Sequence, residues 1–405
     1  MGVDKVIELR IKGLRTIEEL TLPLGGLTLL IGENGAGKSS ILEACEILRR
    51  ASTPAFYSEV LEVHGGLFSL LRHGARHLEL GVTVEGDGPA IRYGVVLTRD
   101  GISSESLELD TGSGLAQPFQ LIRRTGDRAS VASPGQTQPH AAVVRIQPDQ
   151  LLLPKISGPL AGDGTFERMR AALEQIDVHL PFEVRPAWLC AERGWLAPLR
   201  EPAKIQPAAR LSRLGENLAN AYQALKNEFG EEHWKTTMDY VRLGLGPQVE
   251  SINARVDPGG NAIALWLKPR KRAEQLPASA LSDGELSYLA FVALYRLPAR
   301  RSLLAFDEPE LHLHPSLLAR VLSLLSAMAE DHPVLLATHS DRVLDLLKAP
   351  ADAVRVCELD GEDRKTRLRK LDQSALEEWL PEYRGLGQLR TEGYLSAVLE
   401  PEEIA

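Results

Sequence analysis

Apolar and polar residues alternate along the first part of the chain. Residues 3–11 and 17–22 follow a two-residue period, which predicts two half-buried strands. The next segment, Leu27–Ile31, is almost entirely apolar, as expected of a strand buried on both faces. The pattern therefore predicts a small antiparallel meander that leads into a buried strand.

This regularity weakens between residues 51 and 205. Strand-like segments at 77–84 and 91–98 are followed by a predicted buried strand at Ala141–Ile146. Prolines recur over residues 157–210, so short helices and irregular connections are expected there. The region has no sustained heptads, which argues against a long coiled-coil arm. Two polar stretches rich in Gly, Pro and Ser are predicted to be exposed loops: Thr111–Gln117 and Ser130–Gln138.

The second half of the chain has clearer periods. The turn-forming sequence Asp257–Gly260 predicts a hairpin. Further on, short apolar strands alternate with helices, which indicates a mainly parallel sheet covered on both faces. The predicted helices are at about 214–229, 234–243, 285–296 and 316–329, and the predicted strands are at 249–255, 261–267, 303–306 and 334–337.

A glycine-rich turn joins the buried strand Leu27–Ile31 to a helical pattern. The sequence from residue 32 to residue 39 fits GxxxxGK[ST], the P-loop, and this motif is specific when a strand precedes it and a helix follows. Its glycines let backbone N–H groups converge on an anion, and the start of the helix adds further donors. Lys38 would face the β- and γ-phosphates, and the Ser39 hydroxyl suits Mg²⁺. We expect the nucleotide to contact Gly32, Glu33, Asn34, Gly35, Ala36, Gly37, Lys38, Ser39 and Ser40.

Two acids follow the predicted strand 303–306. Asp307 lies where open α/β sheets place their ligands, and a carboxylate there can hold Mg²⁺. Glu308 comes next and is expected to polarise a water molecule toward the γ-phosphate. The alternative, two surface acids, fits poorly with an apolar strand running directly into Asp-Glu-Pro-Glu. We therefore predict Asp307 as a metal ligand and Glu308 as a catalytic residue.

His339 ends the predicted strand 334–337 in the same way, so it is a candidate contact to the γ-phosphate. A histidine at a strand end is often structural, but this one follows Asp307 and Glu308 in strand–helix–strand order. The nearby pair His312 and His314 has no third ligand, so an ordered turn is preferred to a metal site. Catalytic roles are thus predicted for Lys38, Glu308 and His339.

The segment Ser282, Asp283, Gly284 and Glu285 precedes the helix at 285–296. A serine at this position is a common helix cap and needs no other function. The same geometry also presents N–H groups to an anion. Taken alone, the segment is a weak indication of a binding site.

The composition and charge of the chain limit the classes of protein to which it can belong. The chain has 405 residues, 44% of them hydrophobic, and a net charge of −9, which is typical of a globular protein and argues against extensive nucleic-acid-binding charge. Cys45, Cys190 and Cys357 are scattered among apolar neighbours, so buried free thiols are expected. The first residues lack a signal peptide, and no apolar run could cross a bilayer. We therefore expect a cytoplasmic protein that is not a membrane transporter.

Two short basic runs leave contact with DNA open. They span Lys268–Arg272 and Arg364–Lys370. Such runs are usually solvated surface, and a local basic groove remains the alternative. If DNA binds at these runs, its affinity should fall steeply with salt.

The four motifs together resemble the ABC-type ATPases, and among these the soluble RecF/SMC-like branch. The signature Leu281–Glu285 reads Leu-Ser-Asp-Gly-Glu, where transporters typically have Leu-Ser-Gly-Gly-Gln. Asp307–Pro315, followed by Thr338-His339-Ser340, is most similar to the overcoming-lysogenization-defect group and the AAA-15/21-type ATPases of bacterial defence systems. The resemblance is specific over residues 1–48 and 280–345, in outline over 205–280, and poor over 51–205.

The resemblance implies an ABC-type P-loop head with a mainly parallel sheet, an N-terminal antiparallel β subdomain and a helical lobe. It also implies a homodimer in which two heads enclose ATP and Mg²⁺, with Ser282 and Gly284 of one copy closing on the γ-phosphate held by the other. Gln147, or else Gln150, is expected to supply the family's Q-loop glutamine at the metal. About sixty residues follow Ser340, so we expect no TOPRIM nuclease domain in this chain.

These expectations define one head, 1–405, with a poorly recognised lobe at 51–205. The signature, acidic pair and histidine occupy 281–345, and a C-terminal extension occupies 346–405. The expected function is an ATP-driven switch read by a separate effector, such as a nuclease, in anti-phage defence or DNA surveillance. Two alternatives are a RecF-like recombination or repair mediator and an ATP-binding scaffold with little turnover.

Overall fold

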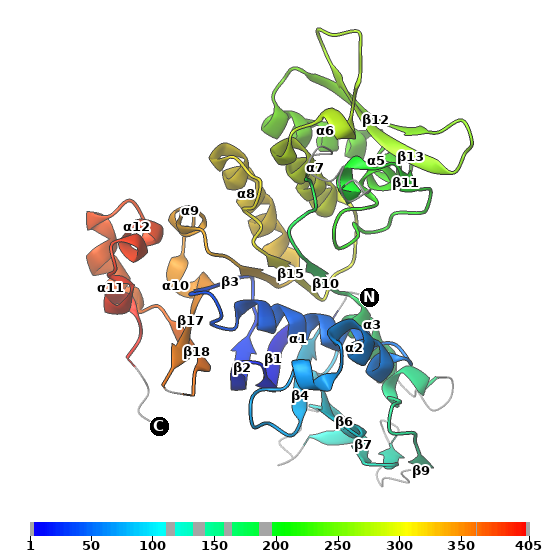
Figure 1. Ribbon diagram of the computed structural model, residues 1–405, viewed down its shortest axis with the longest axis vertical. Helices are drawn as coiled ribbons and strands as arrows, with labels where there is room; N and C mark the ends of the chain where they lie inside the picture. The colour runs from blue at the N-terminus through cyan, green and yellow to red at the C-terminus, as the bar shows by residue number, and fades with distance from the viewer. Residues whose placement is uncertain are drawn as a thin grey trace.

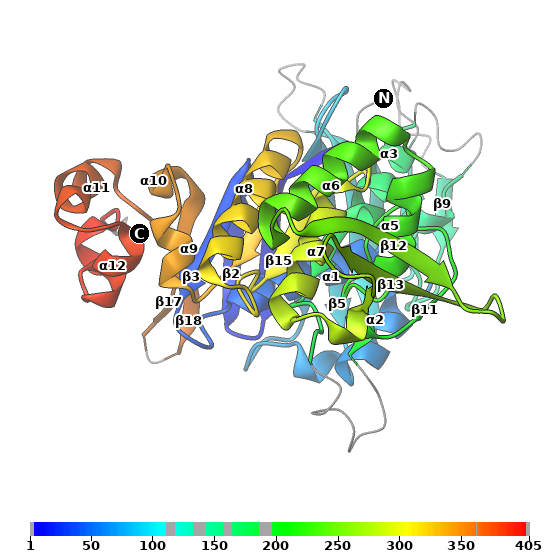
Figure 2. The same cartoon turned by 90° about the horizontal axis from the view of Figure 1, so that it is seen from above.

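The computed structural model describes residues 4–110, 118–132, 142–157, 164–185, 197–361 and 363–401. Three sheets and the helices around them make up this part of the chain (Figure 1). A large antiparallel sheet, here called sheet A, lies at one end, and a central sheet lies next to it. A helical lobe with a small antiparallel sheet lies beyond the central sheet. A group of C-terminal helices lies at the side, as the view from above also shows (Figure 2).

The central sheet has the strand order β10-β15-β16-β3-β17-β18. All neighbouring pairs are parallel except β17 and β18, which form an antiparallel hairpin. The prediction of a mainly parallel sheet is confirmed. Its strands are β3 (Leu27–Gly32), β10 (Ile176–His179), β15 (Leu303–Asp307), β16 (Val334–Ala337), β17 (Val354–Asp360) and β18 (Lys365–Lys370).

Both faces of this sheet are buried, because successive side chains of its strands enter two different cores. Leu30 packs in the core shared with sheet A, whereas Leu29 and Ile31 pack in the core shared with the helical lobe. Strands β15 and β16 alternate in the same way. Their nearly continuous apolar sequences follow from this double burial.

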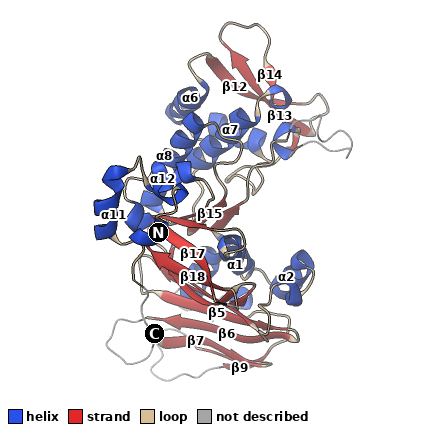
Figure 3. Cartoon of the chain, turned by 60° about the vertical axis from the view of Figure 1, so that its left-hand side comes forward, coloured by secondary structure: helices blue, strands red, loops and turns tan. Residues whose placement is uncertain are grey.

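Sheet A has eight antiparallel strands in the order β2-β1-β4-β5-β6-β7-β8-β9 (Figure 3). The predicted N-terminal meander forms its first edge, so the expected antiparallel β subdomain is confirmed. The strands are β1 (Lys5–Leu14), β2 (Ile17–Pro23), β4 (Leu78–Glu85), β5 (Ile91–Thr98), β6 (Gly101–Leu109), β7 (Phe119–Thr125), β8 (Arg128–Val131) and β9 (Ala142–Arg145).

Three helices lie beside sheet A and the central sheet and form a first set. A second set of helices belongs to the helical lobe. Helices α1 (Lys38–Arg50), α2 (Phe56–His64) and α3 (Thr165–Glu174) belong to the first set. The lobe and its continuation comprise α5 (Leu218–Asn227), α6 (Glu231–Leu245), α7 (Asp283–Arg296) and α8 (Pro315–Asp331), with strands β11 (Ala203–Lys204), β12 (Val249–Val256), β13 (Ala262–Pro269) and β14 (Leu276–Pro277). The C-terminal helices are α9 (Asp341–Asp345), α10 (Pro350–Ala353), α11 (Gln373–Trp379) and α12 (Leu386–Thr391).

Several local expectations need correction. The segment Ala141–Ile146 contains β9, but β9 is an edge strand of sheet A, and the side chain of Val144 on it is 41% exposed. Ser130, expected in a loop, lies in β8. Residues 157–210, expected to hold only short helices and irregular connections, also contain β10, the edge strand of the central sheet beside β15. Strand β10 was not predicted because it is only four residues long and lies in a proline-rich sequence. It is buried because it pairs with β15.

The hairpin turn predicted at Asp257–Gly260 joins β12 and β13, and Asp257 N–H donates to the Ala262 carbonyl at 2.9 Å. Cys45 and Cys357 are buried free thiols, as predicted. Cys190, the loop prediction for Thr111–Gln117 and most of Ser130–Gln138 lie outside the described residues. None of the helices in the described part of the chain combines the length and apolar character that a bilayer crossing requires.

Candidate nucleotide site

The P-loop connects the carboxyl end of β3 to the amino end of α1. Lys38 Nζ donates hydrogen bonds to the Gly32 and Glu33 carbonyls at 2.8 and 2.9 Å, so the loop closes around its own lysine. The Lys38 residue is only 4% exposed. Burial lowers the pKa of Lys38, and the charge of Arg390 lowers it further. An anion bound here would relieve both penalties.

Two P-loop glycines are required by packing as well as by backbone conformation. Gly32 has a φ of +147°, and a Cβ at this position would lie 2.1 Å from the Cys357 carbonyl oxygen on β17. Gly37 has a φ of +98°, and its Cβ would lie 2.5 Å from Thr366 Oγ1 on β18. The β17–β18 hairpin therefore supports the phosphate loop from behind, a role that the sequence did not indicate.

Asp307 lies beside Ser39 at the same edge of the central sheet. Asp307 pairs with Ala337 on β16, and Ala337 pairs with Leu30 on β3, so the three strands end together. Burial raises the pKa of Asp307, and a hydrogen bond with the Ser39 hydroxyl opposes this rise. A carboxylate and a hydroxyl are the oxygen donors that Mg²⁺ accepts, with its remaining positions filled by water and phosphate. The two side chains thus fit the expected metal.

Glu308 adopts an unusual backbone conformation directly after β15. Its φ is +46°, in the left-handed region that a residue with a side chain seldom occupies. Its N–H donates to the Ala337 carbonyl at 2.8 Å, which fixes the turn. Strain of this kind is found at functional sites where the surrounding structure enforces it.

His339 lies across from Glu308, with its Nε2 4.0 Å from Glu308 Oε1. Burial lowers the pKa of His339, and the charge of Lys38 contributes to the same effect. A neutral imidazole can donate one hydrogen bond and accept another. Lys38, Ser39, Asp307, Glu308 and His339, predicted from three separate motifs, therefore meet at one edge of the sheet.

Glu310 is a site residue that the sequence analysis left without a role. Its Oε1 accepts a hydrogen bond from Thr338 Oγ1 at 2.6 Å and another from His339 N–H at 3.3 Å. Burial raises the pKa of Glu310. The residue ties the loop after β15 to the loop after β16 and so positions His339. The only sequence signal was a second acid after Pro309.

The segment Ser282–Glu285 forms a complete capping box at the start of α7. The Ser282 hydroxyl accepts from Glu285 N–H at 3.3 Å, and Ser282 N–H donates to Glu285 Oε2 at 2.8 Å. Asp283 forms an ion pair with the buried guanidinium of Arg200. The segment lies in the helical lobe, and none of these hydrogen bonds or ion pairs reaches the P-loop of the same chain.

Gln147 is not brought to this site. The strand before it, β9, pairs antiparallel with β8 at the outer edge of sheet A, whereas the P-loop follows β3 of the central sheet. The expected metal contact is therefore wrong, and Gln150, in the same connection, is no better placed. The prediction rested only on a strand in the middle region of the chain, without assigning that strand to a sheet. His314 accepts a hydrogen bond from Ser316 N–H and caps α8, which accounts for it as part of an ordered turn.

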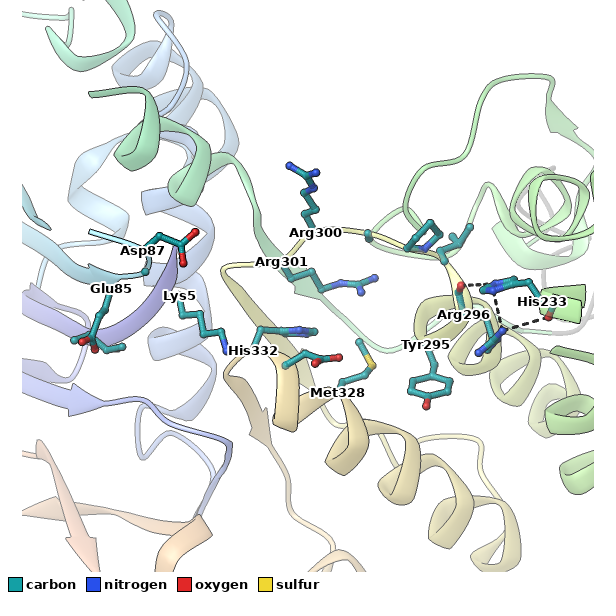
Figure 4. Close-up of a pocket in the computed structure, with 16 residues that line it drawn as sticks. Lys5, Glu85, Asp87, His233, Tyr295, Arg296, Arg300, Arg301, Met328 and His332 are labelled. Atoms are coloured by element: carbon teal, nitrogen blue, oxygen red, sulfur yellow. Dashed lines mark hydrogen bonds between the residues drawn. The ribbon is translucent and has the colours of Figure 1, made fainter. Parts of the chain in front are cut away.

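A cavity of about 770 Å³ opens at the opposite edge of the central sheet (Figure 4). Arg301 and His332 line it, and they precede strands β15 and β16, whereas Asp307 and His339 follow the corresponding carboxyl ends. Arg301 donates to Asp177 Oδ2 at 2.8 Å and to the Leu294 carbonyl at 3.1 Å, so its charge is already used within the fold. This cavity is separate from the nucleotide site.

Comparisons with known proteins agree with the fold. Residues 185–345 match the family model described as "AAA domain, putative AbiEii toxin, Type IV TA system", and residues 8–48 match a second AAA-domain model. The fold is similar to an Smc head bound to the C-terminal winged-helix domain of ScpA, with a TM-score of 0.53 and 15% identity over 91% of this chain and 99% of that one. The fold is also similar to an Smc head from Pyrococcus furiosus, with a TM-score of 0.52 and 13% sequence identity. This match covers 94% of this chain and 99% of that one. These two likenesses show that the chain has the fold of an Smc head.

Two curated proteins are similar to this chain in sequence. The OLD nuclease of Thermus scotoductus is 25% identical over 91% of this chain and 65% of its own length. The DNA repair protein RecN of Bacillus subtilis is 37% identical over 29% of this chain and 21% of its own length. The chain is thus similar in sequence to the AAA-domain family over residues 185–345, and to the OLD nuclease over 91% of this chain. It spans less than two thirds of the length of either relative.

Proposed function

We propose that this chain binds ATP at the P-loop and hydrolyses it, and that the ATP-bound state pairs two copies head to tail. The observation that carries the proposal is the meeting of Lys38, Ser39, Asp307, Glu308 and His339 at the carboxyl edge of the central sheet. Such an edge is where open α/β sheets bind ligands. The match to AAA-domain models supports the same reading.

Each residue has a task in this scheme. Lys38 exchanges its two loop carbonyls for phosphate oxygens, and Glu308 orients and polarises the attacking water. Bound Mg²⁺, held by Ser39 and Asp307, would neutralise charge on the phosphates. His339, held by Glu310 through its backbone N–H, would donate a hydrogen bond to the γ-phosphate. The Ser282 end of α7 from a second copy would complete the site.

Replacing Glu308 by Gln tests the hydrolytic step. The amide keeps the size of the side chain but cannot serve as the base, so turnover should fall at least about a hundredfold while ATP binding persists. Lys38→Ala should lose ATP binding itself. Phosphate release and equilibrium binding of ATP, measured on the same preparations, separate the two effects. Glu330→Gln, at an exposed glutamate near the end of α8, is the matched control. Unchanged turnover in Glu308→Gln would remove Glu308 from the mechanism.

The names of the two relatives support a DNA-related role. One is a nuclease and the other a DNA repair protein. We propose that the ATP cycle is read by a separate effector acting on DNA, with direct repair mediation as the alternative. Pull-down with the ATP-trapped Glu308→Gln protein tests this: a nuclease held only in the ATP state favours the effector. Binding to gapped or branched DNA without a protein partner favours mediation.

The basic runs give limited support for direct DNA contact. In the C-terminal run, Lys365 pairs with Glu18, Arg367 with Asp360 and Arg369 with Glu358. In the other run, Lys268 pairs with Glu250 at 2.8 Å. These ion pairs reduce the charge available to phosphates. We therefore expect any DNA affinity to depend on assembly with another chain.

A further inference from the structure

The C-terminal helix α12 is attached to α9, the short helix that follows His339 (Figures 1 and 2). Two aspartates of α9 hold it. Asp345 Oδ1 accepts hydrogen bonds from Gly387 N–H at 2.7 Å and Gln388 N–H at 3.2 Å. Asp341 accepts one from Arg390 Nη1 at 3.0 Å and one from Thr391 Oγ1 at 2.9 Å. A segment about fifty residues downstream is thus fixed beside the loop that carries His339.

Arg390 is the residue of α12 that lies beside the backbone of His339. Its Nη1 also approaches the His339 carbonyl at 3.4 Å, and its side chain is only 21% exposed. The charge of Arg390 contributes to lowering the pKa of both Lys38 and His339. On Lys38 its effect is larger than that of Asp307 or Glu308. The guanidinium is therefore a cationic group beside the loop after β16, near enough to Lys38 and His339 to influence both electrostatically.

We propose that Arg390 is a ligand of the terminal phosphate of a nucleoside triphosphate, supplied by the C-terminal extension of the same chain. The inference rests on the proposed function and extends it to a residue outside the recognised motifs. When the γ-phosphate is present, Arg390 leaves Asp341 and donates to phosphate oxygens. A guanidinium suits this exchange because its planar set of N–H donors matches either a carboxylate or a phosphate.

The strength of the Arg390–Asp341 pair is compatible with such an exchange. The Asp341 side chain is 40% exposed, and pairs of this exposure contribute little to stability. A terminal phosphate carries more negative charge than one carboxylate and would lie in a less hydrated place. Because Asp341 begins α9, release of Arg390 changes what holds α12 to α9. The position of the C-terminal helices then differs between the triphosphate and diphosphate states.

Two variants that break the same ion pair test the proposal. Arg390→Ala should weaken binding of a slowly hydrolysed ATP analogue about tenfold, as expected for one charge-assisted hydrogen bond, and leave ADP binding within about twofold. Asp341→Asn removes the competing carboxylate and should leave analogue binding unchanged or tighter. Calorimetric titration with each nucleotide gives both affinities, and thermal unfolding reports the fold of each variant.

The opposite pattern would overturn the proposal. If the pair only holds α12 in place, the two variants lose thermal stability together and change the ATP-analogue and ADP affinities alike. If Lys38→Ala abolishes binding but Arg390→Ala binds both nucleotides as the wild type does, the role of Arg390 fails while the ATP site stands. If the folded wild type binds neither nucleotide, the proposed function fails, and the role of Arg390 fails with it.

Discussion

Among the P-loop glycines, Gly32 is the one at which an added Cβ would come nearest to a neighbouring atom. In a Gly32→Ala variant, the added Cβ would meet the Cys357 carbonyl at 2.1 Å, and a backbone atom inside a sheet cannot move aside cheaply. Gly35, with a φ of +79°, has nothing within 4 Å of its Cβ position, so Gly35→Ala should cost only the backbone strain of about 1–2 kcal/mol.

Thermal unfolding of the two alanine variants checks this contrast. We expect Gly32→Ala to lower the apparent Tm several degrees further than Gly35→Ala does. Because both changes add one methyl group to the same loop, Gly35→Ala controls for the left-handed conformation alone. Equal losses would mean that the contact with β17 is not a constraint on the P-loop.

At the scale of single residues, the sequence correctly indicated most of the chemical groups that meet at the candidate nucleotide site. Lys38 was selected from the spacing of the P-loop motif. Asp307, Glu308 and His339 were selected because each follows an apolar strand, and the structure brings all four together. Glu310 and Arg390 were not selected, because a hydrogen bond to a distant backbone or side chain leaves no local pattern in the sequence.

Among the elements, the junction between α8 and β16 buries an ionisable group that the proposed mechanism does not use. Burial lowers the pKa of His332 to about 4, and the charge of Arg301 contributes. His332 Nε2 is buried without a hydrogen-bond partner among the described residues. The folded protein therefore keeps this imidazole neutral over a pH range in which an unfolded chain would protonate it.

This difference predicts an acid-dependent loss of stability. The unfolded pKa is about 6.5, so as the pH falls from about 6.5 toward 4 the unfolded state gains the proton first and the folded state is destabilised. Partial exposure limits the effect to roughly 1–2 kcal/mol. Replacing His332 by Asn should therefore reduce the drop in apparent Tm between about pH 7.5 and pH 5. His73→Asn, at an exposed histidine, is the control. A drop as large as in the wild type would assign the acid sensitivity to other groups.

The elements also show where local patterns suffice. Helices α7 and α8 and strands β3, β15 and β16 were predicted to within a few residues, because their apolar periods are long or their strands are continuously apolar. Strand β10 was missed, and β9, predicted to be buried, lies at the edge of sheet A. Both are four residues long, and their place in a sheet is determined by their neighbours.

At the scale of the whole molecule, the signature segment Ser282–Glu285 lies in the helical lobe, away from the P-loop of its own chain. If ATP pairs two copies head to tail, a site needs the P-loop of one copy and the signature of the other. Lys38→Ala and Ser282→Arg should each abolish turnover alone. Mixed together, they form some dimers with one intact site, built from the P-loop of the second variant and the signature of the first.

We therefore expect the mixture to recover about a quarter of the wild-type ATPase rate at equal total protein, since about half of randomly paired dimers are mixed and each keeps one of two sites. The phosphate-release assay gives the rate, and a mixture of Lys38→Ala with Glu308→Gln is the control. Lys38 and Glu308 serve the same site from the same chain, so no site of a mixed dimer in this control has both groups intact. Absence of recovery in the first mixture would show that the site is not completed by a second copy.

The sequence by itself determined the α/β class, the order of the main elements and the chemical groups of the nucleotide site. It could do so because buried parallel strands are continuously apolar and because phosphate-binding turns require glycines at fixed spacing. Only the tertiary structure decided which strands are neighbours, that the β17–β18 hairpin supports the P-loop, and that Arg390 of the C-terminal extension lies beside the His339 backbone. These are contacts between residues far apart along the chain, and they depend on how whole elements pack.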